Sequence, residues 1–251
     1  MATATGCMSD SPPPRLDPAS DALFLDFDGT LVELADTPHG IAVPAGLASL
    51  LERLSGRLGG RIAVVSGRSL EDLRHHLGGV DLLFAGSHGA ELAYPGGRCV
   101  RALVPEGLEA ARGRIAAFAA ARPGLLVEEK PAGIALHYRG APELEAESRA
   151  HVEAVAKASG MAVVAGKMVA ELRPRGFDKG EALRRLMAEP PYAGARPWFV
   201  GDDVTDEDAF RAAAELGGEG VLVGSSRPTA AGWRLEGVRD VIRWLEAAAH
   251  G

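Results

Sequence analysis

Short apolar runs alternate with stretches of helical spacing from residue 21 onward. Three runs have the length and content of strands buried on both faces of a sheet: residues 22–27, 61–66 and 82–85. Between the first two, the leucines of Pro44–Leu58 recur on one side of a helix. After the second, Ser69 begins another helix, with Asp72 three residues on as its capping-box partner. This alternation predicts an open parallel sheet with helices on both faces.

The pattern changes between about residues 100 and 174. Two helices, at 105–121 and 142–159, are each followed by two strands in which polar and apolar residues mix. These strands are expected at residues 125–130, 133–139, 161–165 and 168–173. The αββαββ order predicts a small α+β domain, a four-stranded sheet backed by two helices, which is inserted into a Rossmann-like parallel core.

Beyond the insertion the core pattern returns. A helix begins at Asp178-Lys179, and Pro197–Gly201 and Gly220–Gly224 are expected to be buried strands. The first twenty residues contain a Ser-Pro-Pro-Pro stretch and lack the basic start and apolar stretch of a signal peptide. We therefore expect a disordered tail at 1–20, a core formed by 21–102 and 175–251, and an inserted domain at 103–174.

Composition and charge narrow the possible partners. Hydrophobic residues make up 47% and charged residues 24% of the 251 positions, which is ordinary for a globular chain with a sizeable core. The net charge of -7 argues against a nucleic acid or an anionic membrane as partner, because either needs a basic face. No apolar run has the length of a membrane span. Two cysteines, Cys7 and Cys99, cannot form a disulfide framework, so a cytoplasmic location is expected.

Two aspartates stand where the first apolar strand ends. Asp26 and Asp28 lie one residue apart, just before a Gly-Thr turn. Asp is a poor strand former, and two such carboxylates repel each other unless a cation lies between them. Sequences tend to break local folding rules where function requires it. The pair therefore suggests a site for a divalent metal and a phosphate.

Three further polar groups fall at strand ends or helix starts. They are Ser66-Gly67-Arg68, Lys179, and the acids Asp202, Asp203 and Asp206. Ligands of open α/β sheets bind beyond the carboxyl ends of the strands, so these groups are expected to meet Asp26 and Asp28 in one crevice. Taken alone, each group has an ordinary explanation as a turn or a helix cap. The occurrence of all of these groups, in this order along the chain, favours a functional site.

The residue types fit phosphoryl transfer. A carboxylate can attack phosphorus and form an aspartyl-phosphate, and the reaction mainly requires positioning and neutralisation of charge on the phosphoryl oxygens. Lys179 supplies a positive charge at a helix N-terminus, which itself favours anions. Ser66 supplies a hydroxyl and neighbouring backbone N–H groups. The acidic cluster after residue 201, together with Asp26, suits Mg²⁺.

Four stretches resemble, in order, the four motifs of the haloacid dehalogenase-like phosphatases: Asp26-Phe27-Asp28-Gly29-Thr30, Ser66, Lys179 and Gly201-Asp202-Asp203. The resemblance implies that Asp26 is the nucleophile and Asp28 the general acid/base. It also implies that the inserted domain is a cap of the kind that this superfamily carries between its second and third motifs.

The same resemblance implies the binding roles. Ser66, Gly67 and Lys179 would hold the phosphoryl group. The Mg²⁺ ligands would be Asp26, Asp202 and, through its backbone carbonyl, Asp28, with Asp203 and Asp206 around that metal site.

A narrower resemblance lies in the cap and its borders. The stretches are Gly86–Glu91, Glu128–Lys130, His137–Arg139, Gly166-Lys167, Glu171–Pro174 and Thr205–Asp208. They are similar to the trehalose-6-phosphate phosphatases, which implies that five cap residues reach the sugar hydroxyls and phosphate: Glu128, Lys130, Arg139, Lys167 and Glu171. Further candidates for substrate binding are Arg68, His88 and Gly89. For Arg68 an ion pair with an acid stays open, and for His88 a structural hydrogen bond.

The resemblance implies a Mg²⁺-dependent phosphatase that hydrolyses trehalose 6-phosphate to trehalose and phosphate through an aspartyl-phosphate. A functional link to a trehalose-6-phosphate synthase follows from that activity. Two alternatives stay open. Related capped phosphatases act on sucrose 6-phosphate, mannosyl-3-phosphoglycerate or other sugar phosphates. A catalytically silent regulator that binds a sugar phosphate would be expected to lose one of four residues that this chain keeps: Asp26, Asp28, Lys179 and Asp202.

Overall fold

The computed structural model describes residues 11–35, 40–103, 106–166 and 168–250. The chain divides into two compact units. The first unit, called the core below, consists of Met1–Val100 and Asp178–Gly251, and the second, the α+β unit, of Arg101–Phe177. Each unit has its own sheet and its own hydrophobic clusters.

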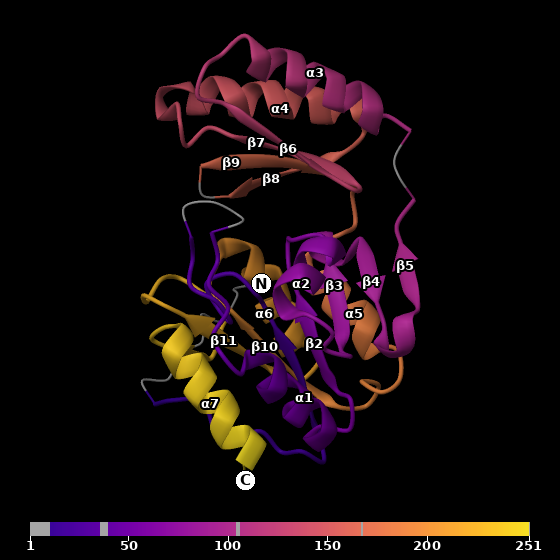
Figure 1. The fold of residues 1–251 in the computed structure, drawn as a ribbon, viewed down its shortest axis with the longest axis vertical. Coiled ribbons are helices and arrows are strands. Elements are labelled where there is room, and N and C mark those ends of the chain that lie inside the picture. The colour runs from indigo at the N-terminus through magenta and orange to yellow at the C-terminus, as the bar shows by residue number, and fades with distance from the viewer. Residues whose placement is uncertain (1–10, 36–39, 104–105, 167, 251) are drawn as a thin grey trace, which may run out of the picture. The chain divides into compact units, whose positions relative to one another are not determined.

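The core is built on an eight-stranded sheet with the order β12-β11-β10-β1-β2-β3-β4-β5 (Figure 1). Its strands are β1 (Asp21–Leu25), β2 (Ile62–Val65), β3 (Leu83–Gly86), β4 (Glu91–Ala93), β5 (Cys99–Arg101), β10 (Arg196–Gly201), β11 (Glu219–Val223) and β12 (Trp233–Leu235). The strands from β12 to β3 pair in parallel, and β4 adds an antiparallel strand to β3. The prediction of a parallel, Rossmann-like α/β core is confirmed.

Helices cover both faces of this sheet because its strands are apolar on both sides. In β1, Leu23 and Leu25 pack into one cluster with α1 (Leu47–Arg57), α2 (Leu70–Leu77) and α7 (Val238–His250). Ala22 and Phe24 pack into the other with α5 (Lys179–Met187) and α6 (Glu207–Glu215). Burial of continuous apolar runs between two helical layers is what parallel sheets require.

The α+β unit has the predicted αββαββ order. Its elements are α3 (Leu108–Ala120), β6 (Leu126–Lys130), β7 (Gly133–His137), α4 (Glu145–Ser159), β8 (Ala162–Gly166) and β9 (Val169–Arg173). The antiparallel sheet has the order β6-β7-β9-β8. Alternate strand residues, among them Ile134, Leu136 and Leu172, pack on the two helices. The other face of the sheet is therefore left for polar side chains.

The N-terminal segment departs from the expectation of a disordered tail over its described part, residues 11–20. Leu16 is buried in the core cluster. The Trp244 Nε1–H donates to the Pro14 carbonyl at 3.0 Å, and the Arg61 Nη2–H donates to the Pro18 carbonyl. The proline-rich composition suggested disorder, but Leu16 packs into the core and the Pro14 and Pro18 carbonyls accept hydrogen bonds from core side chains. The expectation for residues 1–10, including Cys7, lies outside the described residues.

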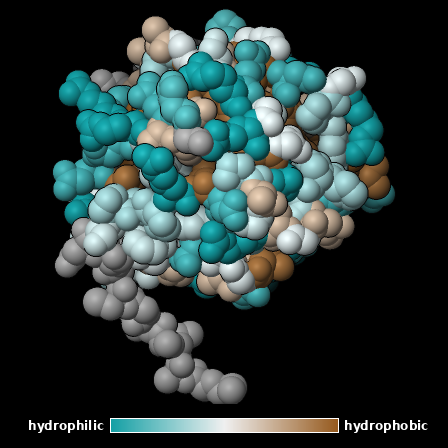
Figure 2. Space-filling view, turned by 90° about the horizontal axis from the view of Figure 1, so that it is seen from below, coloured by the Kyte–Doolittle hydropathy of each residue, from teal (hydrophilic) through white to brown (hydrophobic). Residues whose placement is uncertain are grey.

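The surface shown in Figure 2 is mostly hydrophilic or near neutral in hydropathy, and hydrophobic residues appear on it only in small separate areas. Within the described ranges, no helix has both the length and the apolar character needed to cross a membrane. For comparison, α4 has 15 residues, whereas a spanning helix needs about 20.

Candidate active site

The predicted core residues gather where the central strands end. Asp26 follows β1, Ser66 follows β2 and Asp202 follows β10. Because β1 pairs in parallel with both β2 and β10, these three strand ends are adjacent. The Asp26 N–H extends the pairing by donating to the Val200 carbonyl at 2.9 Å. The topology therefore places Asp26 between the other two.

Lys179 lies within the acidic part of this region. It is the first residue of α5, whose N-cap Asp178 accepts a hydrogen bond from the Glu181 N–H at 2.8 Å. Its Nζ lies 2.7 Å from Asp26 Oδ1 and 2.6 Å from Asp206 Oδ1. Only 3% of the Lys179 side chain is exposed. A buried ammonium held by two carboxylates remains charged, and burial, which acts to lower the pKa of Lys179, is outweighed by Asp206 and Asp26, which raise it.

Three carboxylates surround one small volume. Oxygen atoms of Asp26, Asp202 and Asp206 all lie within 4.8 Å of one another. Burial raises the pKa of Asp26 well above its ordinary value, and the neighbouring Asp206 and Asp202 raise it further against the effect of Lys179. Burial, with repulsion from Asp206, raises the pKa of Asp202 to about 7, and burial also raises the pKa of Asp206. The three carboxyl groups thus disfavour one another's ionisation, and a divalent cation bound among them would favour their ionised forms.

The membership of this cluster differs from the expected ligand set. Asp206, expected around the metal site, lies in the cluster itself and bonds to Lys179. Asp203 instead caps the short helix Val204–Asp206, and its N–H donates to Asp206 Oδ2 at 2.9 Å. The Asp28 carboxylate points to Arg68, and the expected ligand from Asp28, its backbone carbonyl, stays a prediction. The sequence pattern does not indicate which of Asp203 and Asp206 joins the cluster, because the conformation of the turn after β10 determines which side chain faces Lys179.

Glycines at two positions make room for the cluster. A Cβ on Gly29 would lie 2.1 Å from Asp202 Oδ2, and the backbone there has a φ of +72°. A Cβ on Gly201 would lie 2.3 Å from the Asp206 carboxyl carbon. The turn of Asp28-Gly29-Thr30 therefore passes directly over the Asp202 carboxylate, which only glycine permits.

Arg68 connects Asp28 to α2. Its Nε and Nη2 donate to Asp28 Oδ2 at 2.7 Å and to Asp28 Oδ1 at 2.8 Å. Its Nη1 donates to Asp72 and lies 3.4 Å from His76 Nε2. Burial acts to lower the pKa of Arg68, but the contacts with Asp28 and Asp72 raise it. Of the two expected roles of Arg68, the ion pair with an acid is the one seen, and that acid is the predicted acid/base.

The segment after β3 supports Ser66 and Gly67. The His88 N–H donates to the Ser66 carbonyl at 2.9 Å, and the Arg68 N–H donates to Ser66 Oγ at 3.2 Å. A Cβ on Gly67 would lie 2.8 Å from His88 Nε2, so this glycine lets the imidazole approach the loop. Gly89 similarly lies against α5, because a Cβ on Gly89 would lie 2.7 Å from the Cβ of Ala182. These contacts give His88 and Gly89 a packing role, and their proposed contact with substrate stays a prediction.

In the α+β unit, three of the predicted residues share one face of the sheet. Glu128 and Glu171 both lie opposite Ala135 on neighbouring strands, and Lys130 lies opposite Gly133. This is the face away from the helices. Since Gly133 and Ala135 are small, Lys130 Nζ reaches Glu171 Oε2 across β7 at 2.5 Å. Burial acts to lower the pKa of Lys130, but Glu171 and Glu128 outweigh it and raise that pKa.

The other residues of this unit that the sequence singled out lie in different surroundings, and the predicted substrate contacts of Arg139 and Lys167 stay predictions. His137, on the same sheet face, lies with Nε2 2.8 Å from Glu128 Oε2. Arg139 follows β7 and is exposed, and Glu129 is exposed on the other face of β6. Lys167 lies outside the described residues.

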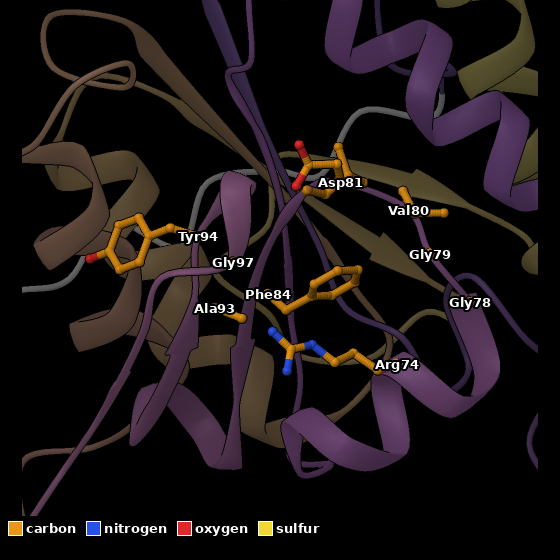
Figure 3. Close-up of a pocket in the computed structure, with 10 residues that line it drawn as sticks. Arg74, Gly78, Gly79, Val80, Asp81, Phe84, Ala93, Tyr94 and Gly97 are labelled. Carbon is orange, nitrogen blue, oxygen red and sulfur yellow. The ribbon is translucent and has the colours of Figure 1, made fainter.

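A separate cavity of about 320 Å³ lies beside β3 and β4 in the core (Figure 3). Its lining includes Arg74, Asp81, Phe84 and Tyr94, and none of the predicted site residues. The residues predicted to carry the chemistry therefore lie outside this cavity.

Comparison with known proteins decides the family. The trehalose-phosphatase family model matches residues 24–239, which include all four motif regions of the core and the whole α+β unit. The chain belongs to the trehalose-phosphatase family. The prediction of a phosphatase, a hydrolase of phosphoric esters, is thereby confirmed.

Two relatives in this family are similar to the chain over most of their length. The chain is 41% identical over 209 residues to the probable trehalose-phosphate phosphatase of Sinorhizobium fredii, covering 82% of this chain and 79% of the relative. It is 38% identical over 232 residues to the trehalose-6-phosphate phosphatase of Escherichia coli, covering 91% and 86%. The similarity thus extends over both units.

Solved structures give the same fold. The C-terminal domain of C. albicans trehalose-6-phosphate phosphatase is 25% identical, with a TM-score of 0.81 over 94% of this chain and 98% of that one. A haloacid dehalogenase-like hydrolase from Bacteroides thetaiotaomicron, 17% identical, has a TM-score of 0.64 over 91% and 99%. The second likeness shows the superfamily fold, as the order of motifs predicts.

Two parts of this phosphatase's site had no clear signal in the sequence. The sequence predicts Asp72 only as the capping-box partner of Ser69 at the start of α2, yet its carboxylate also binds Arg68. Arg227 contacts the acidic loop after β10, although 24 residues separate it from Asp203. The position of Arg227 in the sequence does not indicate that its side chain reaches the Asp203 carbonyl in another loop.

Proposed function

We propose that this trehalose-phosphatase family member hydrolyses trehalose 6-phosphate to trehalose and inorganic phosphate. The observation that carries the proposal is the buried contact of Asp26 with Lys179 at 2.7 Å beside Asp202 and Asp206. It provides a nucleophilic carboxylate, a fixed cation for phosphoryl oxygens and a cation-binding acidic cluster in one place. The relative from Escherichia coli, which is named for this substrate, supports the choice of sugar.

The first chemical step would form a bond between an Asp26 carboxylate oxygen and phosphorus. The bond from phosphorus to the sugar oxygen breaks, and that oxygen takes a proton from Asp28. In the second step water attacks the phosphorus of the aspartyl-phosphate and gives a proton to Asp28. The bond from phosphorus to Asp26 then breaks and inorganic phosphate leaves. Lys179, with Ser66 and the backbone at Gly67, neutralises and orients the phosphoryl oxygens in both steps.

The donor set fits Mg²⁺. Three carboxylates with oxygen atoms within 4.8 Å provide the hard oxygen ligands that this ion prefers. Asp26, Asp202 and Asp206 would hold it, together with the backbone at Asp28. When bound, the ion would supply positive charge that favours ionised Asp26 and neutralises the phosphoryl oxygens.

Recognition of the sugar falls to the α+β unit as a cap. Its polar sheet face offers Glu128, Lys130 and Glu171, and Arg139 and Lys167 complete the proposed set. Charged donors and acceptors arranged for sugar hydroxyls discriminate strongly against analogues that cannot pair with them. A functional link to a trehalose-6-phosphate synthase and a cytoplasmic location belong to the same proposal.

Phosphate release from a panel of sugar phosphates tests this function. Trehalose 6-phosphate, sucrose 6-phosphate, mannosyl-3-phosphoglycerate and glucose 6-phosphate would be compared with and without Mg²⁺. We expect the highest kcat/KM with trehalose 6-phosphate, and loss of turnover with EDTA. The Asp26→Asn variant should fold and release no phosphate. A higher kcat/KM for another sugar would reassign the substrate, and turnover by the Asn variant would refute the nucleophile.

A further inference from the structure

We propose that Arg227 is a positioning residue that holds the backbone of the acidic loop Gly201–Asp206, so that its carboxylates converge on the metal-binding cluster. The acidic loop is under repulsion, since three acidic residues occur within five positions and two of them join Asp26 in the cluster. Such a loop needs a restraint that acts on its backbone and leaves its carboxylates free for a cation.

Sheet order explains how Arg227 reaches this loop. Arg227 lies in the segment after β11, and β11 pairs in parallel with β10, which ends at Gly201. Adjacent parallel strands bring their following loops side by side. The contact therefore follows from the topology, although it spans 24 residues of sequence.

The contacts of Arg227 go to carbonyl oxygens and not to the acidic side chains of the cluster. Its Nη2 donates to the Asp203 carbonyl at 2.8 Å and lies 3.5 Å from the Asp202 carbonyl. Its Nη1 donates to Glu207 and lies 3.3 Å from the Pro228 carbonyl. A planar guanidinium can make these contacts in two directions at once, whereas an ammonium cannot fix the same plane.

Glu207 ties this arrangement to helix α6. It is the first residue of α6, and its side chain is only 12% exposed. One of its carboxylate oxygens accepts from Arg227, and the other accepts from the Ala230 N–H at 2.8 Å. Glu207 thus fixes both the guanidinium and the segment that carries it. Hydrogen bonds with charged partners are the strong ones in proteins, so this pair can hold the loop.

The test measures Mg²⁺ binding by calorimetry on the full chain, with the metal alone. The inference rests on the proposed function only for the identity of the ion, and no substrate enters the measurement. We expect Arg227→Gln to weaken Mg²⁺ binding roughly 10- to 100-fold, the range seen when partners of metal ligands are removed. Arg227→Lys should recover part of that loss.

Arg234→Gln is the matched control, because Arg234 also donates to a backbone carbonyl, that of Gly224, at 3.0 Å. It should bind Mg²⁺ like the wild type. Glu207→Gln, which keeps an acceptor for Ala230, should show a smaller loss than Arg227→Gln, and the double variant should add little. This provides a second measurement if Arg227→Gln folds poorly.

Binding within twofold of wild type in both Arg227→Gln and Glu207→Gln would overturn the proposal, as would an equal loss in Arg234→Gln. A failure of the substrate panel would refute the proposed activity and leave these affinities unaffected. The two proposals can therefore fail separately.

Discussion

Arg68 holds the predicted acid/base Asp28 by a two-point contact, from Nε to Oδ2 at 2.7 Å and from Nη2 to Oδ1 at 2.8 Å. Both oxygens of Asp28 are engaged, which fixes the plane of the carboxylate. Asp72 in turn binds the third guanidinium nitrogen of Arg68. The orientation of Asp28 therefore depends on α2, an element that contributes no residue to the phosphatase motifs.

The first prediction concerns this contact. Arg68→Lys keeps the charge but cannot make the two-point contact, so kcat/KM for trehalose 6-phosphate should fall roughly 10- to 100-fold, given about 1.5–3 kcal/mol for hydrogen bonds to charged groups. Steady-state phosphate release measures this. Asp72→Asn, which loosens Arg68 indirectly, should lose less. An unchanged kcat/KM in Arg68→Lys would mean that Asp28 needs no such orientation.

The second prediction concerns pH. The raised pKa of Asp202, about 7, means that protons compete with Mg²⁺ for this carboxylate. Affinity for Mg²⁺ should therefore rise as pH rises toward 7, and the raised pKa values of Asp26 and Asp206 act in the same direction. Calorimetric titrations at pH 6, 7 and 8 measure this. A pH-independent affinity would contradict the assignment of Asp202 as a ligand.

The same shift has a consequence for stability. The pKa of Asp202 is higher in the folded than in the unfolded chain, so the folded state binds the proton more tightly between the unfolded value of about 4 and pH 7. The contribution of Asp202 to stability without metal therefore falls as pH rises through this window. In melting experiments with EDTA, the Tm of wild type relative to Asp202→Asn should decrease from pH 5 to pH 7. An increase in this Tm difference would mean that folding lowers the pKa of Asp202 and does not raise it.

The sequence predicts those site residues that the sheet topology alone brings together, and not those whose position depends on the conformation of a loop. Asp26, Ser66, Lys179 and Asp202 could be placed together because each lies at a strand end or helix start, and parallel topology brings such ends to one edge. The position of Asp206 could not be predicted, because it depends on the turn geometry after β10. Contacts of long side chains with distant carbonyls, such as those of Arg227, also leave no periodic signal.

The third prediction concerns the pair Lys130 and Glu171, which lie 2.5 Å apart across β7. Removing either partner leaves the other charge without this contact, so Lys130→Met or Glu171→Gln should each destabilise the protein by about 1–3 kcal/mol. The double variant should lose less than the sum, because both single variants remove the same contact. Chemical denaturation measures these differences.

The control for that cycle is the exposed pair Arg122 and Glu147, with Nη2 and Oε1 2.6 Å apart. Its removal should change the free energy of unfolding by less than about 1 kcal/mol, as is usual for surface pairs. Strict additivity at Lys130 and Glu171 would show that their contact has no energetic weight.

The fourth prediction separates steric from conformational roles of glycine. Gly29 and Gly46 both have positive φ, +72° and +82°, so alanine at either position costs about 1–2 kcal/mol of backbone strain. They differ in their surroundings, since a Cβ on Gly46 meets nothing within 4 Å, whereas one on Gly29 lies 2.1 Å from Asp202 Oδ2.

Gly46→Ala should therefore lower the Tm by a few degrees and leave Mg²⁺ affinity and kcat/KM near wild type. Gly29→Ala should displace the Asp202 carboxylate and weaken both by roughly 10- to 100-fold, the range for disturbed support of a metal ligand. Equal Mg²⁺ affinities in the two variants would show that the turn does not set the position of Asp202.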